Sequence, residues 1–304
     1  MSETVAVDVD GRTLRLSNLN KVLYPEIGLT KGEIVHYYTA IAPALLPHLA
    51  GRPLTVKRYP SGVDGPFFYE KNASRGKPDW VRTVRLPAPG STKNRDEIDY
   101  LVVEELATLV WLANLAALEL HTPQWTVGPR GGVHGADQLV LDLDPGAPAA
   151  IGECGQVALL LRDALAEDGL TPVAKTSGSK GMQLYAAIEE TPSDTVNEYA
   201  HGLAKRLEEA HPELVVSRMT KSLRPGKVLV DWSQNNAAKT TVSVYSLRAR
   251  PTATVSTPVT WDEVAAAADG APLSFTQADV LGRLEDGDLF TPLLGSERPA
   301  LRQR

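Results

Sequence analysis

Two aspartates lie inside an apolar segment near the middle of the chain, in LVLDLDPG at residues 139–146. Alternate residues of a β-strand face the same side, so Asp142 and Asp144 share one face while the leucines pack on the other. Adjacent carboxylates repel each other and are costly to bury without a positive partner. A divalent cation removes that cost, and oxygen ligands suit Mg²⁺ or Mn²⁺. The alternative is that Asp-Pro-Gly simply begins a turn, which leaves Asp142 without a role.

A third carboxylate, Asp231, lies in the apolar segment VLVDWS and is the only acid between residues 215 and 250. Three strand aspartates can bind two metal ions for phosphoryl or nucleotidyl transfer. A D-x-D pattern also occurs in sugar-nucleotide transferases, where it holds Mn²⁺ and a diphosphate. The three carboxylates predict a metal site and leave both reaction classes open.

A glycine loop, KTSGSKG at residues 175–181, follows between two predicted strands. Its glycines allow a tight turn and a close approach to a ligand. The side chains of Ser177 and Lys180, with free backbone N–H groups, could bind a triphosphate. The loop is not a P-loop, because a strand follows it instead of a helix. By itself it could be a plain hydrophilic hairpin; beside three aspartates, phosphate binding is favoured.

Basic and amide side chains follow Asp231 closely, namely Gln234, Arg248 and Arg250. On a strand, Arg248 and Arg250 would share a face and meet the same phosphates. The alternative is a solvated edge strand protected by charge.

The net charge of −6 is unevenly distributed along the chain. Residues 1–95 have 14 basic and 8 acidic side chains and residues 215–250 have 7 and 1, a net of +6 in each segment. Residues 96–214 have a net of −14 (6 basic, 20 acidic). The two basic segments could form a groove for a polyanion, or their charges could be scattered over solvated faces.

A single cysteine excludes intramolecular disulfides. The sequence shows no signal peptide and no membrane-spanning run, and it therefore predicts a cytoplasmic protein.

The pattern of elements from residue 138 is strand, helix, strand, strand, helix, strand, the split-βαβ order of RNA-recognition-type sheets. The helices are expected at 153–168 and 193–211, with strands at 138–144, 172–177, 182–188, 228–233 and 241–247. Before it, the sequence predicts a hairpin around Asp10-Gly11, a helix over 31–49 opened by a capping box, a strand over 53–59, mostly loop over 60–95 and a long helix over 96–120. Two short helices are expected near 262 and over 275–285.

Three motifs together, LDLDPG, KTSGSKG and DWSQNN followed by KTT and YSLR, resemble the polymerase domain of bacterial ATP-dependent DNA ligase D, in the archaeo-eukaryotic primase superfamily. The resemblance covers nearly the whole chain. It implies an α+β primase fold: an N-terminal α/β module (about 1–135) on an RNA-recognition-motif-like antiparallel sheet module (about 136–250), with a C-terminal helical tail (about 251–304). It also implies a template-directed DNA repair polymerase or primase-polymerase that uses two Mn²⁺ or Mg²⁺ ions. Such enzymes add nucleotides, often ribonucleotides, at gaps and broken ends in non-homologous end joining.

The resemblance also implies roles for individual residues. The catalytic metal ligands are Asp142, Asp144 and Asp231. The contacts to the incoming NTP or dNTP are Lys57, His121, Ser177, Lys180, Gln183, Gln234, Arg248 and Arg250. His121 could equally be a satisfied core histidine.

Residues that match the DNA-gripping part of the family lie near the N-terminus. Asn18, Lys21 and Lys31 match positions that hold a downstream 5′-phosphate, and Lys31 would gain from the start of a helix. Phe67 and Phe68 match aromatics that stack on template bases. The alternatives are ordinary lysines flanking a helix and a phenylalanine pair of which one points into the core.

Gln183 departs from the family pattern, which has histidine there; glutamine can donate a hydrogen bond but cannot bring a positive charge. A second hypothesis is therefore a catalytically weak module that binds DNA ends or 5′-phosphates. The sequence contains no ligase or nuclease motif, so it predicts a stand-alone, nucleoid-associated protein without a membrane partner. Its expected partners are DNA with gaps, overhangs or 5′-phosphorylated ends, a Ku-type end-binding protein and a separate DNA ligase.

Overall fold

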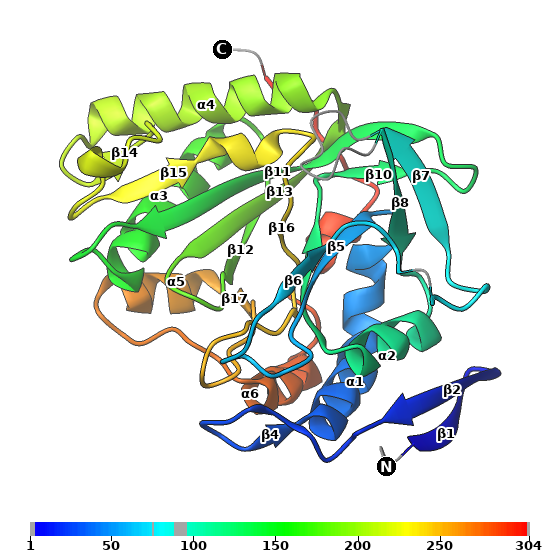
Figure 1. Ribbon diagram of the computed structural model, residues 1–304. Helices are drawn as coiled ribbons and strands as arrows, with labels where there is room; N and C mark the ends of the chain where they lie inside the picture. Colours follow the sequence, from blue (N-terminus) through cyan, green and yellow to red (C-terminus); the bar gives the residue numbers. More distant parts are fainter. Residues whose placement is uncertain (1–3, 75, 88–95, 303–304) are drawn as a thin grey trace.

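The computed structural model describes residues 4–74, 76–87 and 96–302 (Figure 1). Part of the predicted loop, 88–95, lies outside the described residues. The fold is built on two sheets that lie side by side, with helices packed against both. It is the predicted α+β class.

The first sheet has the predicted split-βαβ order of elements. These are β11 (Val133–Pro145), α3 (Ile151–Glu167), β12 (Pro172–Thr176), β13 (Met182–Thr191), α4 (Ser193–Ala210) and β15 (Val228–Asp231). In space the strands run β15-β11-β13-β12, each antiparallel to its neighbour. Shorter strands extend the sheet: β14 (Val215–Val216), β17 (Pro258–Val259) and β10 (Trp125–Val127).

Both long helices of this unit cover one face of the first sheet. Leu139, Leu141 and Leu143 of β11 are buried there against α3 and α4. Because side chains alternate along a strand, Asp142 and Asp144 face the opposite side, toward the second sheet. The alternation that identified β11 in the sequence therefore also sets the direction of the carboxylates.

The second sheet belongs mostly to the N-terminal part. Its order is β16 (Thr241–Val242), β9 (Ala117–Thr122), β5 (Pro53–Arg58), β8 (Glu97–Val102) and β7 (Thr83–Pro87), with β6 (Phe68–Glu70) paired to β5. Helices α1 (Lys31–Leu49) and α2 (Leu106–Asn114) pack beside it. The predicted capping box is present at the start of α1, where Thr30 and Glu33 bond reciprocally. One apolar cluster joins α1 and the second sheet to Val140 and Tyr185 of the first sheet.

The predicted long helix over residues 96–120 is wrong. The segment forms β8, α2 and β9, and Ala116 has a φ of 56°, which no helix accommodates. The segment is apolar on all sides, and such a run cannot distinguish a buried helix from buried strands. The predicted strand over 241–247 is also mostly wrong, since only Thr241–Val242 is a strand and Tyr245 has a φ of 62°.

The two ends of the chain add small elements. The predicted hairpin is present as β1 (Thr4–Val9) and β2 (Arg12–Ser17), followed by β3 (Val22–Tyr24) and β4 (Leu29–Thr30). The C-terminal part forms α5 (Trp261–Ala268) and α6 (Gln277–Arg283), close to the predicted short helices. None of the helices in the described residues is both long and apolar enough to span a bilayer.

Candidate active site

The three aspartates meet where β11 and β15 pair. Asp142 lies directly opposite Asp231 in the register of the two strands, and Asp144 is the next residue on the same face of β11. One carboxylate oxygen from each residue lies within 4.8 Å of the other two. We call Asp142, Asp144 and Asp231 the carboxylate cluster. The sequence predicted this convergence, and the structure supports it.

None of the three carboxylates forms an ion pair with a residue in the part of the chain that the structure describes. Burial, and then the neighbouring charge of Asp144, raise the pKa of Asp142 to about 7. Burial and Asp231 also raise the pKa of Asp144, and Arg224 opposes that rise. Asp231 is held in place by the N–H of Ser233 at 3.0 Å and by Nε2 of Gln234 at 2.8 Å. Oxygen-only donors with unbalanced negative charge fit a hard divalent cation such as Mg²⁺ or Mn²⁺.

A cavity of about 450 Å³ opens beside the carboxylate cluster. Of the residues that the sequence predicted for the site, those that line it are Asp142, Asp144, His121, Ser177, Lys180, Gln183, Gln234 and Arg248. Asp231 lies behind its wall, and Lys57 lies close by. Residues far apart in the sequence therefore form one concave surface lined by both acidic and basic side chains.

The glycine loop forms the floor of the cavity between β12 and β13. Gly178 has a φ of +65°, and a Cβ at Gly181 would collide with the backbone of Leu143, so both positions require glycine. The hydroxyl of Ser177 accepts hydrogen bonds from the N–H groups of Ser179 and Gly181, each at 3.2 Å. Ser177 therefore organises the loop, while Lys180 is exposed and lines the cavity.

A second buried acid, Glu119 of β9, lies among cations. Its carboxylate is 3.0 Å from Nε2 of His121, 3.3 Å from Nζ of Lys57 and 3.5 Å from Nε of Arg248. Burial opposes ionisation, but the hydrogen bond of His121 and the charge of Arg248 outweigh it and keep the pKa of Glu119 well below its usual range. We call these four residues the Glu119 cluster. Sequence reasoning missed Glu119, although a lone acid in the apolar strand ALELHT was a signal.

Burial also lowers the pKa of His121, although its bond to Glu119 opposes the shift. His121 is thus paired and also lines the cavity, and its contact to a nucleotide stays a prediction.

The two arginines after Asp231 do not share a strand face. Arg248 donates to the carbonyl of Ser177 at 2.5 Å and so ties its own loop to the glycine loop. Arg250 is exposed and lies outside the cavity lining. The prediction that the two residues lie on one strand is wrong, because the segment after Val242 turns.

Two further residues of the cavity wall, or next to it, were missed from the sequence. Arg224 lines the cavity and acts on Asp144. Lys175 is wholly buried behind Gln183. Arg224 lies in the basic segment 215–250, and Lys175 is a lysine inside an apolar strand, which was its signal.

The N-terminal lysines lie outside the cavity. Lys21 is exposed and donates to the carbonyl of Pro60 at 2.6 Å, and Lys31 is buried with Nζ 2.9 Å from the carbonyl of Asn114. Asn18 begins the turn between β2 and β3, with its carbonyl 3.0 Å from the N–H of Lys21. The backbone N–H of Lys31 is used within the protein, so the expected gain from the start of α1 is wrong at this residue.

Phe67 and Phe68 are both exposed, at 48% and 57% of their surface. The alternative that one of them points into the core is therefore wrong. Phe67 stacks on Tyr59, with ring centroids 5.4 Å apart, and Nζ of Lys57 lies 4.6 Å from the centroid of the Phe67 ring. Tyr69, also 57% exposed, continues this surface to the cavity, and sequence reasoning missed it.

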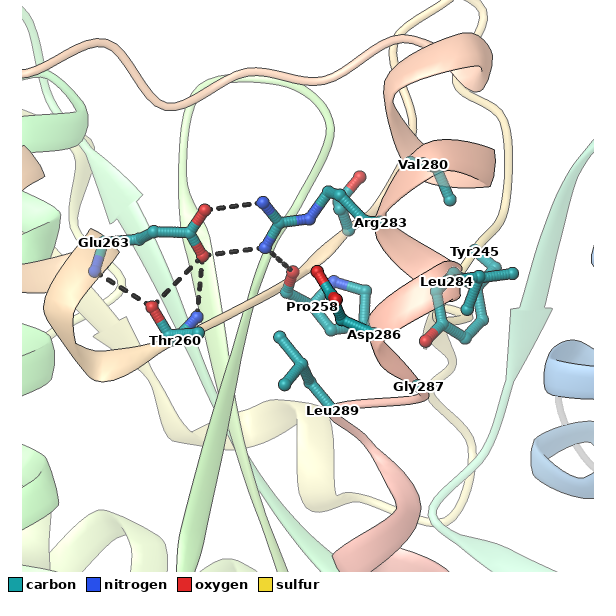
Figure 2. A pocket seen from close by; sticks show the side chains of 11 residues that line it. Tyr245, Pro258, Thr260, Glu263, Val280, Arg283, Leu284, Asp286, Gly287 and Leu289 are labelled. Atoms are coloured by element: carbon teal, nitrogen blue, oxygen red, sulfur yellow. Dashed lines mark hydrogen bonds and ion pairs between the residues drawn. The ribbon is translucent and has the colours of Figure 1, made fainter.

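A second cavity, of about 330 Å³, lies between α5 and α6 (Figure 2). Its most prominent charged pair is already satisfied, because the guanidinium of Arg283 binds both oxygens of Glu263, at 2.6 and 2.7 Å. Arg283 also donates to the carbonyl of Pro258. These bonds fasten the C-terminal helices to each other and to β17, which indicates a structural role.

Comparisons with known proteins agree with this geometry. A family model described as "LigD, primase-polymerase domain" matches residues 30–290. The chain is 43% identical over 285 residues to the multifunctional non-homologous end joining protein LigD of Mycobacterium bovis, covering 91% of this chain and 36% of the relative. It is 31% identical over 274 residues to the bifunctional LigD of Bacillus subtilis, covering 90% and 42%. The chain thus spans well under half the length of these relatives.

A solved structure is equally similar. The polymerase domain from Mycobacterium tuberculosis ligase D, in complex with DNA, superposes with a TM-score of 0.87 at 42% identity, covering 93% of this chain and 98% of that one. The expected primase fold is therefore confirmed. The chain belongs to the LigD primase-polymerase domain family.

Proposed function

We propose that this chain is a DNA repair polymerase that adds nucleotides to a primer opposite a template, at gaps and broken ends, with Mn²⁺ or Mg²⁺ as its cofactor. The convergence of Asp142, Asp144 and Asp231 on a cavity with a basic opposite wall is the observation that carries the proposal. The carboxylate cluster would hold two ions. When bound, such ions neutralise phosphate charge and favour the attacking 3′-hydroxylate.

The remaining wall of the cavity supports a role in binding the nucleotide. Lys180 and Arg248 would bind the triphosphate, and the glycine loop lets the phosphates approach its backbone. His121 and Tyr69 lie at the other end, their rings 6.4 Å apart, and would contact the sugar. Gln234 supports the site through Asp231. Lys57 and Arg250 would add charge at the rim.

The exposed aromatic residues and the N-terminal lysines support DNA binding outside the cavity. Phe67 and Phe68 would stack on template bases, since about half of each side chain is exposed. Lys21 and Lys31, with Asn18 between β2 and β3, would hold a downstream 5′-phosphate. A Ku-type protein, a DNA ligase and a chromosomal site of action follow from the relatives' role in end joining, and they belong to this proposal.

Primer extension tests the proposal. A gapped duplex with a 5′-phosphate is incubated with Mn²⁺ and either rNTPs or dNTPs, beside the Asp142→Ala variant. We expect nucleotide addition that the variant loses, with ribonucleotides preferred. Tight, salt-sensitive binding to the same duplex without any extension would instead favour the second candidate, a DNA-end binding module, which the uncharged Gln183 suggests. Affinity for nucleotide sugars with none for the gapped DNA would contradict both.

A further inference from the structure

A row of polar side chains crosses the first sheet through the carboxylate cluster. In the strand registers Asp231 lies opposite Asp142, Asp142 opposite Gln183, and Gln183 opposite Lys175. Directly opposed residues on neighbouring antiparallel strands face the same side. The four side chains therefore lie in line on one face, with two acids at one end and a lysine at the other. We call them the polar row.

Lys175 is wholly buried, with 0% of its surface exposed. Within the described residues, its Nζ has three hydrogen-bond acceptors. They are the Oε1 atom of Gln183, the carbonyl of Val242 at 3.1 Å and the hydroxyl of Ser256 at 2.6 Å. A lysine ammonium has three N–H bonds, so each has a partner. Burial lowers the pKa of Lys175 well below its usual range, and the charge of Asp142 opposes that shift. Three acceptors placed around Nζ fit the ammonium form.

Both other acceptors fix the direction of these bonds. The carbonyl of Val242 can only accept. The hydroxyl of Ser256 gives its one hydrogen to the carbonyl of Thr176, at 2.9 Å, and so accepts from Lys175. Lys175 therefore donates to both residues and uses its third N–H on Gln183.

This bond fixes which way the amide of Gln183 points. Because Lys175 only donates, Gln183 must turn its oxygen toward the lysine and its NH₂ group away from it. The NH₂ group then faces Asp142, which lies directly opposite Gln183 in the strand register. The same contact lowers the pKa of Asp142, against the effect of burial. With the opposite orientation, Gln183 would put an oxygen against the acid and an NH₂ group against the ammonium, two repulsive contacts in one buried place.

We propose that Lys175 is a positioning residue for divalent cation binding, acting through Gln183 on Asp142. Lys175 holds the amide of Gln183 so that its NH₂ group points at the carboxylate of Asp142. The lone pairs of that carboxylate that do not face Gln183 are then left for a cation bound at the carboxylate cluster. Residues that orient a metal ligand in this way change metal affinity when they are lost. The inference rests on the proposed function insofar as the ligands are those of the carboxylate cluster.

A purely structural role for Lys175 is the competing explanation. Val242 belongs to β16 of the second sheet, so the lysine also fastens the two sheets together. That role would affect global stability and leave the cation affinity of the folded protein unchanged. The two explanations therefore differ in what a cation titration measures.

The test is Mn²⁺ titration of the folded chain, with free Mn²⁺ measured by electron paramagnetic resonance. Lys175→Met keeps the stem of the side chain and removes the charge, while Gln183→Met removes the amide and leaves Lys175 on its other two acceptors. We expect each variant to weaken Mn²⁺ binding about tenfold. The double variant should be no weaker than either single one, because both changes break one chain of contacts.

A control and a rescue separate positioning from packing. Ser256→Ala removes an acceptor of the same ammonium but leaves all four residues of the polar row and the Lys175–Gln183 bond in place, so it should lower stability and leave Mn²⁺ affinity within twofold. In the Lys175→Met/Gln183→His double variant, the imidazole can take the tautomer that donates to Asp142 without help, and Mn²⁺ affinity should return to within threefold.

Unchanged Mn²⁺ affinity in Lys175→Met, or an equal loss in Ser256→Ala, would overturn the inference. If Lys175→Met does not fold, Gln183→Met decides with the same expected loss. Wild-type chain that binds Mn²⁺ but never extends a primer would reject the polymerase and leave the role of Lys175 standing. Wild-type chain that binds no Mn²⁺ would overturn both.

Discussion

Two buried carboxylate sites border one cavity and differ in how their charge is balanced. In the carboxylate cluster, burial and the neighbouring acid raise the pKa of Asp142 to about 7. In the Glu119 cluster, Lys57 and Arg248 lie beside a single acid that is also bonded to His121, and its pKa lies well below its usual range. Among the described residues, the acids of the first site form no ion pair, whereas the acid of the second site is paired with two cations. The comparison indicates that the paired charges of the Glu119 cluster stabilise the fold, whereas the unpaired acids of the carboxylate cluster are the candidates for chemistry.

The largest effect should come from Glu119→Gln, which leaves Lys57 and Arg248 beside a neutral amide. Breaking a buried ion pair by removing one partner costs about 3–5 kcal/mol, and we expect about 3 kcal/mol because the glutamine keeps some hydrogen bonds. Urea unfolding measures the loss. Glu190→Gln is the control, because its partner His134 is exposed and the pair should contribute less than about 1 kcal/mol. A loss below about 1 kcal/mol in Glu119→Gln would refute the idea that this site is tightly balanced.

The second largest effect should be a gain in stability. Asp142→Asn removes a carboxyl whose ionisation burial opposes, so metal-free protein should gain about 2 kcal/mol at pH 8, by urea unfolding in EDTA. Because the pKa of Asp142 is raised in the folded protein, the free energy of unfolding of the wild type falls as the pH rises. Well below pH 4 the carboxyl is protonated in both states; as pH rises from about 4 to about 7, only the unfolded chain ionises and the wild type loses stability.

The variant should therefore lack this fall between pH 4 and 7, and saturating Mn²⁺ should reverse the order by stabilising only the wild type. Asp64→Asn, at an exposed acid, serves as the control. Equal stability of the wild type at pH 5 and pH 8 would show that the cluster is not short of positive charge. The Glu119 cluster should behave oppositely, because an acid with a lowered pKa loses its contribution only when the pH falls.

A third, smaller effect tests whether the charge of Glu119 is balanced by several residues or by Lys57 alone. Lys57→Met keeps the length of the side chain beside the ring of Phe67 and removes one of the two cations. His121 and Arg248 still balance Glu119, so we expect a loss of about 1 kcal/mol in urea unfolding, from one partly exposed ion pair and its cation–π contacts. A loss as large as that of Glu119→Gln would mean that Lys57 alone balances the acid.

The sequence predicted the carboxylate cluster far better than the Glu119 cluster, for a physical reason. Asp142 and Asp144 are two residues apart on a strand with clear alternation, so local periodicity was sufficient to put them on one face. Glu119 contacts Arg248 only through the packing of segments that lie 129 residues apart in the sequence. In addition, the sequence pattern predicts a long helix where the structure has the strand of Glu119. The polar row likewise depends on the register of β12 and β13, which no single segment encodes.

The smallest effect on stability should come from Lys180→Ala, and it separates binding from folding. Lys180 is exposed at the cavity, and among the described residues it has no ion pair, so its removal should change stability by less than about 0.5 kcal/mol. A charge-assisted bond to a phosphate contributes about 1.5 kcal/mol or more, so KM for the nucleotide should rise roughly tenfold in primer extension. Lys205→Ala, at an exposed lysine of α4, should change neither quantity. If KM stays constant in Lys180→Ala, Lys180 does not bind the triphosphate. The cations of the Glu119 cluster would then be the ones that bind it, in addition to balancing Glu119.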